Sequence, residues 1–459
     1  MWMDTVLDRF VEQSPFSVMT RATLENLFAD TFLDQLFQDY AQVQYHKQLA
    51  FSTVTTLLTQ VVLRYRPSLR SAYQRTEGVP ATLKAVYEKA QHVETCVCQE
   101  LVRQTADRAH GVLACWPQAL RPDAVPGLRL RIVDGNYLAG TQHRLAPLRG
   151  DGAAALPGMS VVLRDDRTGL LTRLASREDA YTNERALLDG LLAWVAPDDL
   201  LVADRNFCWF DFLLGLIDRD AFFVCRHHEQ VGLTDVAPRR RRGRTRTGTA
   251  YEHTVEIGPA ERRVRLRCIV IQRDEPTRDG ETAIRLLSNV PPKKAAATLL
   301  ADLYWRRWTI EHSFQELTDH LRCEVDTLGY PKAASFGFCL AVCAYNVLAV
   351  LKGALASVHG QAKVEAEFSS YTMAQEISQD TSGLLIALPP PFWVRFARMS
   401  GVELAAWLKQ TATRVSWESH RKSKRSPSKK SQPPPQKKKG GRRRAHVSTA
   451  RVLNNRYQV

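Results

Sequence analysis

The sequence has no apolar run long enough to cross a membrane. Its most apolar stretch, Phe336 to Leu351, spans 16 residues and contains Asn346, whereas a membrane helix needs about 20 residues. The N-terminus, MWMDTVLDRF, lacks the basic start and the apolar core of a signal peptide. We therefore expect a soluble protein with no membrane partner, in which residues 336–351 form a buried helix.

An ordered cysteine pattern is also missing. The nine cysteines are odd in number and scattered, and the C-x-C of Cys96 and Cys98 does not have zinc-site spacing. Most of the others lie in apolar runs such as FFVCR and LRCIV, where cysteine acts as a small hydrophobic residue. These features favour a reducing, cytoplasmic compartment.

Acidic residues are absent from the end of the chain. Residues 421–459 carry 14 Lys or Arg and no Asp or Glu, so of the net charge of +15 only about +1 remains on residues 1–420. A segment this basic suits a polyanion such as DNA, because each phosphate contact releases counterions. The alternative is a solvated extension without a partner. In either case the low-complexity stretch lacks apolar residues for a core, and we expect residues 421–459 to be disordered.

The first part of the chain predicts a helical domain. Over residues 1–125, apolar residues recur at three- and four-residue spacing. Part of this region has a basic face, which is either solvated or used to bind DNA ends; it consists of Arg64, Arg66, Arg70 and Arg75.

At Pro126 the pattern changes to that of a mixed α/β sheet. LRLRIVDG alternates as a strand does, and MSVVLRD and LLTRLAS flank a predicted turn at Asp166–Gly169. Helices then alternate with the apolar strands DLLVAD and AFFVCRH. We expect residues 126–228 to form the first part of a mixed sheet with helices.

The later segments differ from one another. Residues 229–290 predict a β-rich insertion with a basic loop, residues 291–360 a helical second part of the core, and residues 361–420 a C-terminal helical region. The basic loop is either solvated or, as we expect, in contact with DNA; it contains Arg239, Arg240, Arg241 and Arg242.

Three carboxylates are candidates for chemistry. Asp134 and Asp204 end predicted strands, where ligands gather in α/β sheets, although Asp is also a common turn former. Glu311 lies on a predicted helix that places Tyr304 and Arg307 on the same face. For that helix, an ordinary amphipathic face with a surface ion pair is the alternative.

Together, these carboxylates suit metal ions. Mg²⁺ is a hard cation that binds carboxylates and leaves other positions to water and phosphate oxygens. Two such ions about 3.5–4 Å apart can activate an attacking oxygen and stabilise a leaving oxygen in phosphodiester cleavage. We therefore expect Asp134, Asp204 and Glu311 to hold two Mg²⁺ ions, with Mn²⁺ as a substitute.

Three blocks carry a family resemblance. IVDGNYL (132–138), LVADRNF (201–207) and YWRRWTIEHSFQEL (304–317) resemble the signature blocks of bacterial insertion-sequence transposases of the D-D-E type. The match is closest to the insertion-sequence-four family, whose hallmark is Tyr, two residues, Arg, three residues, Glu, six residues and Lys. Tyr304, Arg307 and Glu311 fall on this pattern, and the resemblance covers roughly residues 126–400.

The resemblance implies both a fold and an activity. The fold is an RNase H-like catalytic core interrupted by a β insertion before the glutamate helix. The activity is metal-dependent cleavage of double-stranded DNA at the ends of an insertion sequence, followed by strand transfer into target DNA by a homodimer in a synaptic complex. Tyr304 and Arg307 would contact the DNA backbone near the cut. Such a protein acts in the bacterial cytoplasm, on the nucleoid.

The chain departs from the hallmark at Thr318, where the family has Lys. Thr318 can offer a hydroxyl to a phosphate but no charge. Arg322 lies eleven residues beyond Glu311, close to three helical turns, and we hypothesise that it compensates by contacting DNA. The alternatives are a weakened, transposase-derived DNA-binding protein, an RNase H-like nuclease without strand transfer, and a basic protein that coats DNA. The three carboxylates argue for an active enzyme.

Overall fold

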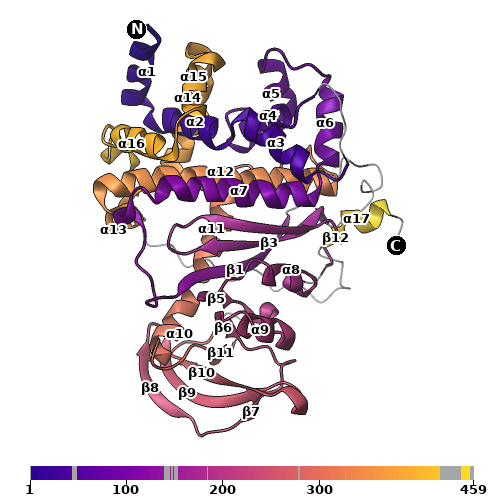
Figure 1. Ribbon diagram of the computed structural model, residues 1–459, viewed down its shortest axis with the longest axis vertical. Coiled ribbons are helices and arrows are strands. Elements are labelled where there is room, and N and C mark those ends of the chain that lie inside the picture. Colours follow the sequence, from indigo (N-terminus) through magenta and orange to yellow (C-terminus); the bar gives the residue numbers. More distant parts are fainter. Residues whose placement is uncertain are drawn as a thin grey trace, which may run out of the picture.

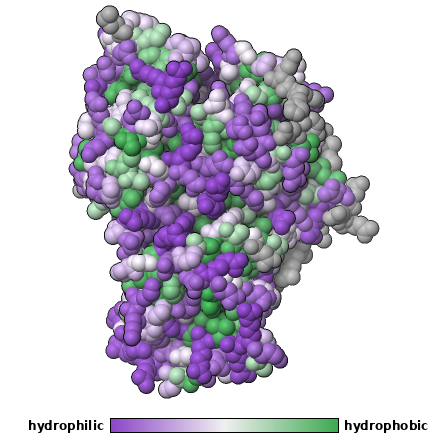
Figure 2. Space-filling view, viewed as in Figure 1, coloured by the Kyte–Doolittle hydropathy of each residue, from purple (hydrophilic) through white to green (hydrophobic). Residues whose placement is uncertain are grey.

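The predicted mixed α/β class is confirmed. The computed structural model describes residues 2–43, 49–138, 145, 148, 154–182, 184–277, 280–325, 327–423 and 446–454. A layer of helices lies above a long twisted sheet, and the later strands of that sheet extend away from the helical layer (Figure 1). On the face drawn in Figure 2, hydrophilic residues cover most of the surface and hydrophobic ones are scattered among them.

Ten of the described strands form one sheet in the order β4-β3-β1-β5-β6-β11-β10-β9-β7, with β8 paired to β9. Strand β1 is antiparallel to β3 and parallel to β5, which is parallel to β6. The bounds are β1 (Arg129–Leu138), β3 (Gly158–Asp165), β4 (Leu171–Arg177), β5 (Asp199–Ala203), β6 (Phe222–Arg226), β7 (Thr234–Asp235), β8 (Arg240–Thr245), β9 (Gly248–Ile257), β10 (Val264–Arg273) and β11 (Ala283–Ser288).

The strands predicted within residues 229–290 extend the core sheet, because β11 pairs with β6. The prediction of a basic loop is wrong. Arg240, Arg241 and Arg242 belong to β8, which forms a hairpin with β9, and Arg239 directly precedes it. The strand tolerates this charge because all four arginines are exposed to solvent.

The helical layer combines N-terminal helices with helices that follow the sheet, around one large hydrophobic core and a smaller cluster between α1, α2, α14 and α15. Helix α2 packs against α14 and α15, and α7 packs against α12. The bounds are α1 (Trp2–Gln13), α2 (Pro15–Leu27), α3 (Asp30–Tyr40), α4 (Phe51–Val62), α5 (Leu69–Arg75), α6 (Leu83–His92), α7 (Thr95–Leu113), α12 (Pro331–His359), α13 (Gln361–Glu367), α14 (Ser370–Ala387), α15 (Pro390–Ala397) and α16 (Gly401–Ala412). The opposite face of the sheet is covered by α8 (Leu188–Leu192) and α9 (Phe210–Ile217).

The predicted buried helix is α12. By length and composition it could cross a membrane, but 89% of its most apolar window is buried inside the protein. Its Asn346 is almost fully buried and pairs with the backbone of the edge strand β4. The amide accepts from Leu171 N at 2.8 Å and donates to Leu171 O at 2.8 Å. This contact fastens the core helix to the sheet.

The prediction of disorder over residues 421–459 is wrong for residues 421–423, where Arg421 bridges Phe368, and for residues 446–454. Strand β12 (His446–Ser448) pairs in parallel with β2 (Ala154–Leu156), and α17 (Thr449–Leu453) follows. Val447 is fully buried against Ala155, so this segment has the apolar anchor that the lysine-rich stretch lacks. Arg451 binds Asp179 at 2.8 Å. Residues 424–445 and 455–459 lie outside the described residues.

We expect Asn346→Leu to lower the free energy of unfolding by about 2–4 kcal/mol, because each buried polar group left unpaired costs roughly 1–3 kcal/mol. Equilibrium urea denaturation measures this loss. The control is Ser357→Ala on the same helix, whose hydroxyl donates to Ala354 O of that helix at 2.7 Å. Equal stability of the two variants would contradict the anchoring role.

Candidate active site

Asp134 and Asp204 lie where the pairing between the parallel strands β1 and β5 ends. The pairing of β1 with β5 ends at Val133 and Ala203, so the next residue on each strand is one of the two aspartates. Asp204 directly follows β5, as predicted. Asp134 does not end its strand, because β1 stays paired with β3 as far as Leu138.

Local backbone bonds hold both carboxylates. Asp134 Oδ1 accepts from Gly135 N at 2.9 Å, and Asp204 Oδ1 accepts from Arg205 N at 2.7 Å. The buried Cys225 thiol donates to Asp204 O at 3.3 Å. Because side chains alternate along a strand, both aspartates point to the face that packs under the helical layer.

The single helix predicted to carry the hallmark is in fact two helices. Helix α10 (Ala297–Trp305) ends before α11 (Trp308–Asp319) begins, and two arginines lie between them. Arg307 N donates to Tyr304 O at 3.1 Å, and Ile310 N donates to Arg307 O at 3.0 Å. These are the shorter-range bonds of a 3₁₀ turn, which often marks a hinge.

The side chain of Arg307 lies at the centre of the site. It is only 10% exposed, and its Nη1 lies 2.8 Å from Asp134 Oδ2 and 2.6 Å from Glu311 Oε1. Burial acts to lower the pKa of Arg307, but the surrounding negative groups, with Asp134 foremost and Asp204 and Glu311 among them, outweigh it and raise the pKa. The guanidinium therefore stays charged and balances the carboxylates.

Tyr304 contacts Asp204, the third of the candidate carboxylates. Its hydroxyl lies 3.5 Å from Asp204 Oδ1, and its side chain is buried. Burial, and then the charge of Asp204, raise the pKa of Tyr304, so the phenol stays protonated as a donor. The predicted contacts of Tyr304 and Arg307 with DNA stay predictions, since both polar groups are directed at carboxylates here.

The donor chemistry of the site fits magnesium. The candidate ligands are carboxylate oxygens, which hard cations prefer, and two of them converge on the same nitrogen of Arg307. Within the described part of the chain, no group of three or more His, Cys, Asp and Glu side chains is close enough together to hold a metal ion as it stands. Binding a metal therefore requires the carboxylates to shift from Arg307 toward the ion.

Arg205 and Arg226 lie near Asp204 and were not predicted. Both pair with Glu281, Arg205 at 3.7 Å and Arg226 more closely. The only sequence signal was that Arg205 directly follows Asp204, since Arg226 and Glu281 come from distant positions. They add positive charge at this edge of the site.

The structure does not bring Arg322 to the face of Glu311. Helix α11 ends at Asp319, Arg322 N donates to Val62 O at 2.8 Å, and its guanidinium binds Pro67 O. The helical argument for compensation is therefore wrong. The reason is that the chain turns away to pack against the N-terminal helices.

Thr318 is exposed near the end of α11. Its hydroxyl donates to Phe314 O at 3.1 Å, and its own carbonyl accepts from Arg64 at 2.7 Å. Thr318 as a DNA contact stays a prediction.

The arginines of β8 lie beside the helix that carries Tyr304, because β8 contacts α10. Arg242 pairs with Glu252 at 2.7 Å. Arg239, Arg240 and Arg241 are exposed, which makes their charges available to a partner.

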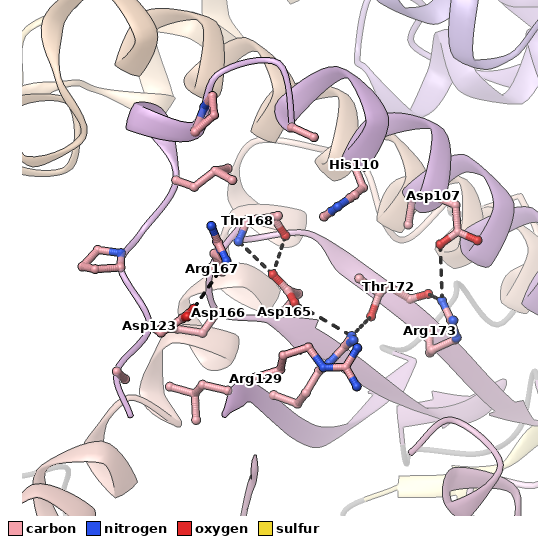
Figure 3. A pocket seen from close by; sticks show the side chains of 18 residues that line it. Asp107, His110, Asp123, Arg129, Asp165, Asp166, Arg167, Thr168, Thr172 and Arg173 are labelled. Atoms are coloured by element: carbon pink, nitrogen blue, oxygen red, sulfur yellow. Dashed lines mark hydrogen bonds and ion pairs between the residues drawn. The ribbon is translucent and has the colours of Figure 1, made fainter. Parts of the chain in front are cut away.

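A cavity of about 510 Å³ lies at the other end of β1 (Figure 3). Acidic and basic side chains mix along its wall, among them Asp107, Asp165, Arg131 and Arg173. The three candidate carboxylates do not line it, so it is separate from the candidate active site.

Residues 126–347 match the family model described as the transposase DDE domain. The matched range contains Asp134, Asp204 and Glu311. A protein of Sinorhizobium fredii (strain NBRC 101917 / NGR234), named "Putative transposase y4zB", is 28% identical over 172 residues, 36% of this chain and 45% of the relative. The chain thus spans less than half the length of this relative. Both matches support a transposase.

Among solved structures, the chain is similar to the piggyBac transposase synaptic complex with hairpin DNA. The similarity covers 86% of this chain and 84% of the other, at 10% identity and a TM-score of 0.38. A TM-score this low does not establish a common fold.

We expect Arg307 and Asp134 to be strongly coupled in stability. A double-mutant cycle with Arg307→Met and Asp134→Asn should give a coupling energy of about 1–3 kcal/mol, as for other contacting residues. The matched control is the pair Arg244 and Asp274, which are 2.7 Å apart but exposed, so that solvent screens them. Coupling no larger than in the control would contradict the central role of Arg307.

Proposed function

We propose that the protein is a DNA transposase that cleaves DNA at the ends of an insertion sequence and joins them to target DNA. The observation that carries the proposal is the convergence of Asp134 and Glu311 on the buried Arg307, with Asp204 beside them in contact with Tyr304. These carboxylates come from two parallel strands and a helix far apart in the sequence, within the range that matches the transposase DDE domain.

The strand order supports an RNase H-like core as part of this proposal. The strands β4, β3 and β1 are antiparallel neighbours, and β5 and β6 continue from β1 in parallel. Strands β7 to β11 are inserted between β6 and α10, where the resemblance to the insertion-sequence-four family places a β insertion.

Asp134, Asp204 and Glu311 would hold Mg²⁺, or Mn²⁺ with the same oxygen ligands. When bound, the ions supply an activated attacking oxygen and stabilise the leaving oxygen of the phosphodiester. Arg307 balances the charge of the carboxylates, and Tyr304 donates to Asp204. The two strands and the helix position the backbone at each carboxylate, so that only the side chains would have to turn from Arg307 toward the ions.

Double-stranded DNA is the proposed partner. The exposed arginines of β8 lie beside α10, and the net charge of +15 favours a polyanion. The proposal also includes a synaptic homodimer, strand transfer and action on the bacterial nucleoid, because the family resemblance implies them.

A second candidate function is a weakened, transposase-derived DNA-binding protein. The observation that favours it is Thr318, which carries no charge and whose hydroxyl already bonds within its own helix.

The first test compares Mg²⁺-dependent cleavage of DNA carrying the element's own ends by wild type and Glu311→Gln. We expect wild type to cut only with Mg²⁺, and the variant to lose cleavage while it keeps DNA binding. The control is Glu316→Gln, which removes a carboxylate of the same helix that pairs with Lys352 at 2.9 Å. Binding without cleavage in the wild type would favour the second candidate.

The β8 arginines should contribute to the salt dependence of DNA binding. We expect Arg240→Gln with Arg241→Gln to reduce the slope of log affinity against log salt by about 0.9 for each phosphate that these side chains neutralise. Fluorescence anisotropy at several salt concentrations measures the slope. Arg262→Gln, an exposed arginine outside β8 that pairs with Asp218 at 3.2 Å, is the control. Equal slopes for both variants would remove β8 from the DNA interface.

A further inference from the structure

Asp166 is a buried aspartate held by several arginines. It is only 2% exposed. Its carboxylate lies 2.7 Å from Arg306 Nη1, 3.3 Å from Arg164 Nη1 and 3.5 Å from Arg121 Nη1. The sequence assigned Asp166 only to a hairpin turn, and a turn residue does not need to be buried with this much positive charge.

Of these three arginines, only Arg306 belongs to the segment that joins α10 to α11. Arg164 belongs to the same hairpin as Asp166, and Arg121 lies in the segment after α7. Arg306 lies at the break between α10 and α11, next to Arg307. The pair of Arg306 and Asp166 therefore connects the helix break directly to the sheet.

The consecutive residues Arg306 and Arg307 bind aspartates at two separate points on the same face of the sheet. Asp166 N donates to Leu130 O at 3.1 Å, which places Asp166 beside Leu130. Asp134 lies four residues further along β1, or about 13 Å at the rise of a strand. Arg306 and Arg307 thus hold the break at two positions, with an aspartate at each.

We propose that Arg306 and Asp166 are positioning residues that fix the break between α10 and α11, and so place Arg307 and Glu311 against Asp134. The catalytic consequence rests on the proposed function, whereas the positioning does not. The break needs such a hold because its backbone has the shorter bonds of a 3₁₀ turn, which often marks a hinge.

The next residue of the hairpin offers a matched control. Arg167 pairs with Asp123 at 3.6 Å on the wall of the cavity in Figure 3. Arg167→Gln removes the same charge one residue from Asp166, and the ion pair that it breaks involves neither α10 nor α11. Arg306→Gln is the test variant, because Asp166 keeps Arg164 and Arg121 and the protein can still fold. Arg306→Lys restores the charge.

The first readout is hydrogen exchange of the α11 backbone, measured by mass spectrometry on the full chain without metal or DNA. We expect Arg306→Gln to speed exchange in α11 but not in α7 or α12, and Arg306→Lys to restore most of the protection. Arg167→Gln should match wild type. Unchanged exchange in Arg306→Gln, or an equal increase in all three helices, would overturn the proposal.

The second readout is Mg²⁺-dependent cleavage at saturating DNA. We expect Arg306→Gln to cut at least about tenfold more slowly with unchanged DNA affinity, because a misplacement of about 1 Å can cost on the order of 100-fold. Arg306→Lys should recover most of this rate. Wild-type cleavage by Arg306→Gln would overturn the positioning role. If wild type itself does not cut, the proposed function fails, and the exchange result alone decides the positioning.

Discussion

The candidate site depends on one constraint: three carboxylates gathered under a helical layer need a positive charge among them. Repulsion between like charges grows as water is excluded, and the buried guanidinium of Arg307 offsets it. The register of β1 and β5 places the two aspartates, and the break between α10 and α11 places Arg307 and Glu311 over them.

The surrounding architecture keeps this arrangement in place. Helix α12 is buried along most of its length and joins the edge of the sheet through Asn346. Helix α7 packs between α12 and the β4 edge. A packed interior resists small displacements, so the strands that carry the aspartates form a firm base. The bend between α10 and α11 is a point of weaker backbone bonding, and side chains hold it there.

The arginines of the protein include buried ones that pair with carboxylates and exposed ones on the surface. Buried arginines that pair with carboxylates, such as Arg307 and Arg164, serve the structure. Others lie exposed along β8 next to α10, where no nearby acid neutralises all of them. This division separates the arginines that shape the site from those available to a polyanionic partner.

The sequence by itself determined the mixed α/β class, the buried helix and the three blocks that contain the carboxylates, because periodicity and motif spacing are local properties. It did not determine that Asp134 lies within its strand, that the hallmark helix is broken, that the basic run is a strand, or that Arg322 turns away from Glu311. At Asp166 it indicated only a turn. These features depend on partners far along the chain, such as Val162 for Asp134 and Pro67 for Arg322. Only the tertiary structure decides which of those partners are within reach.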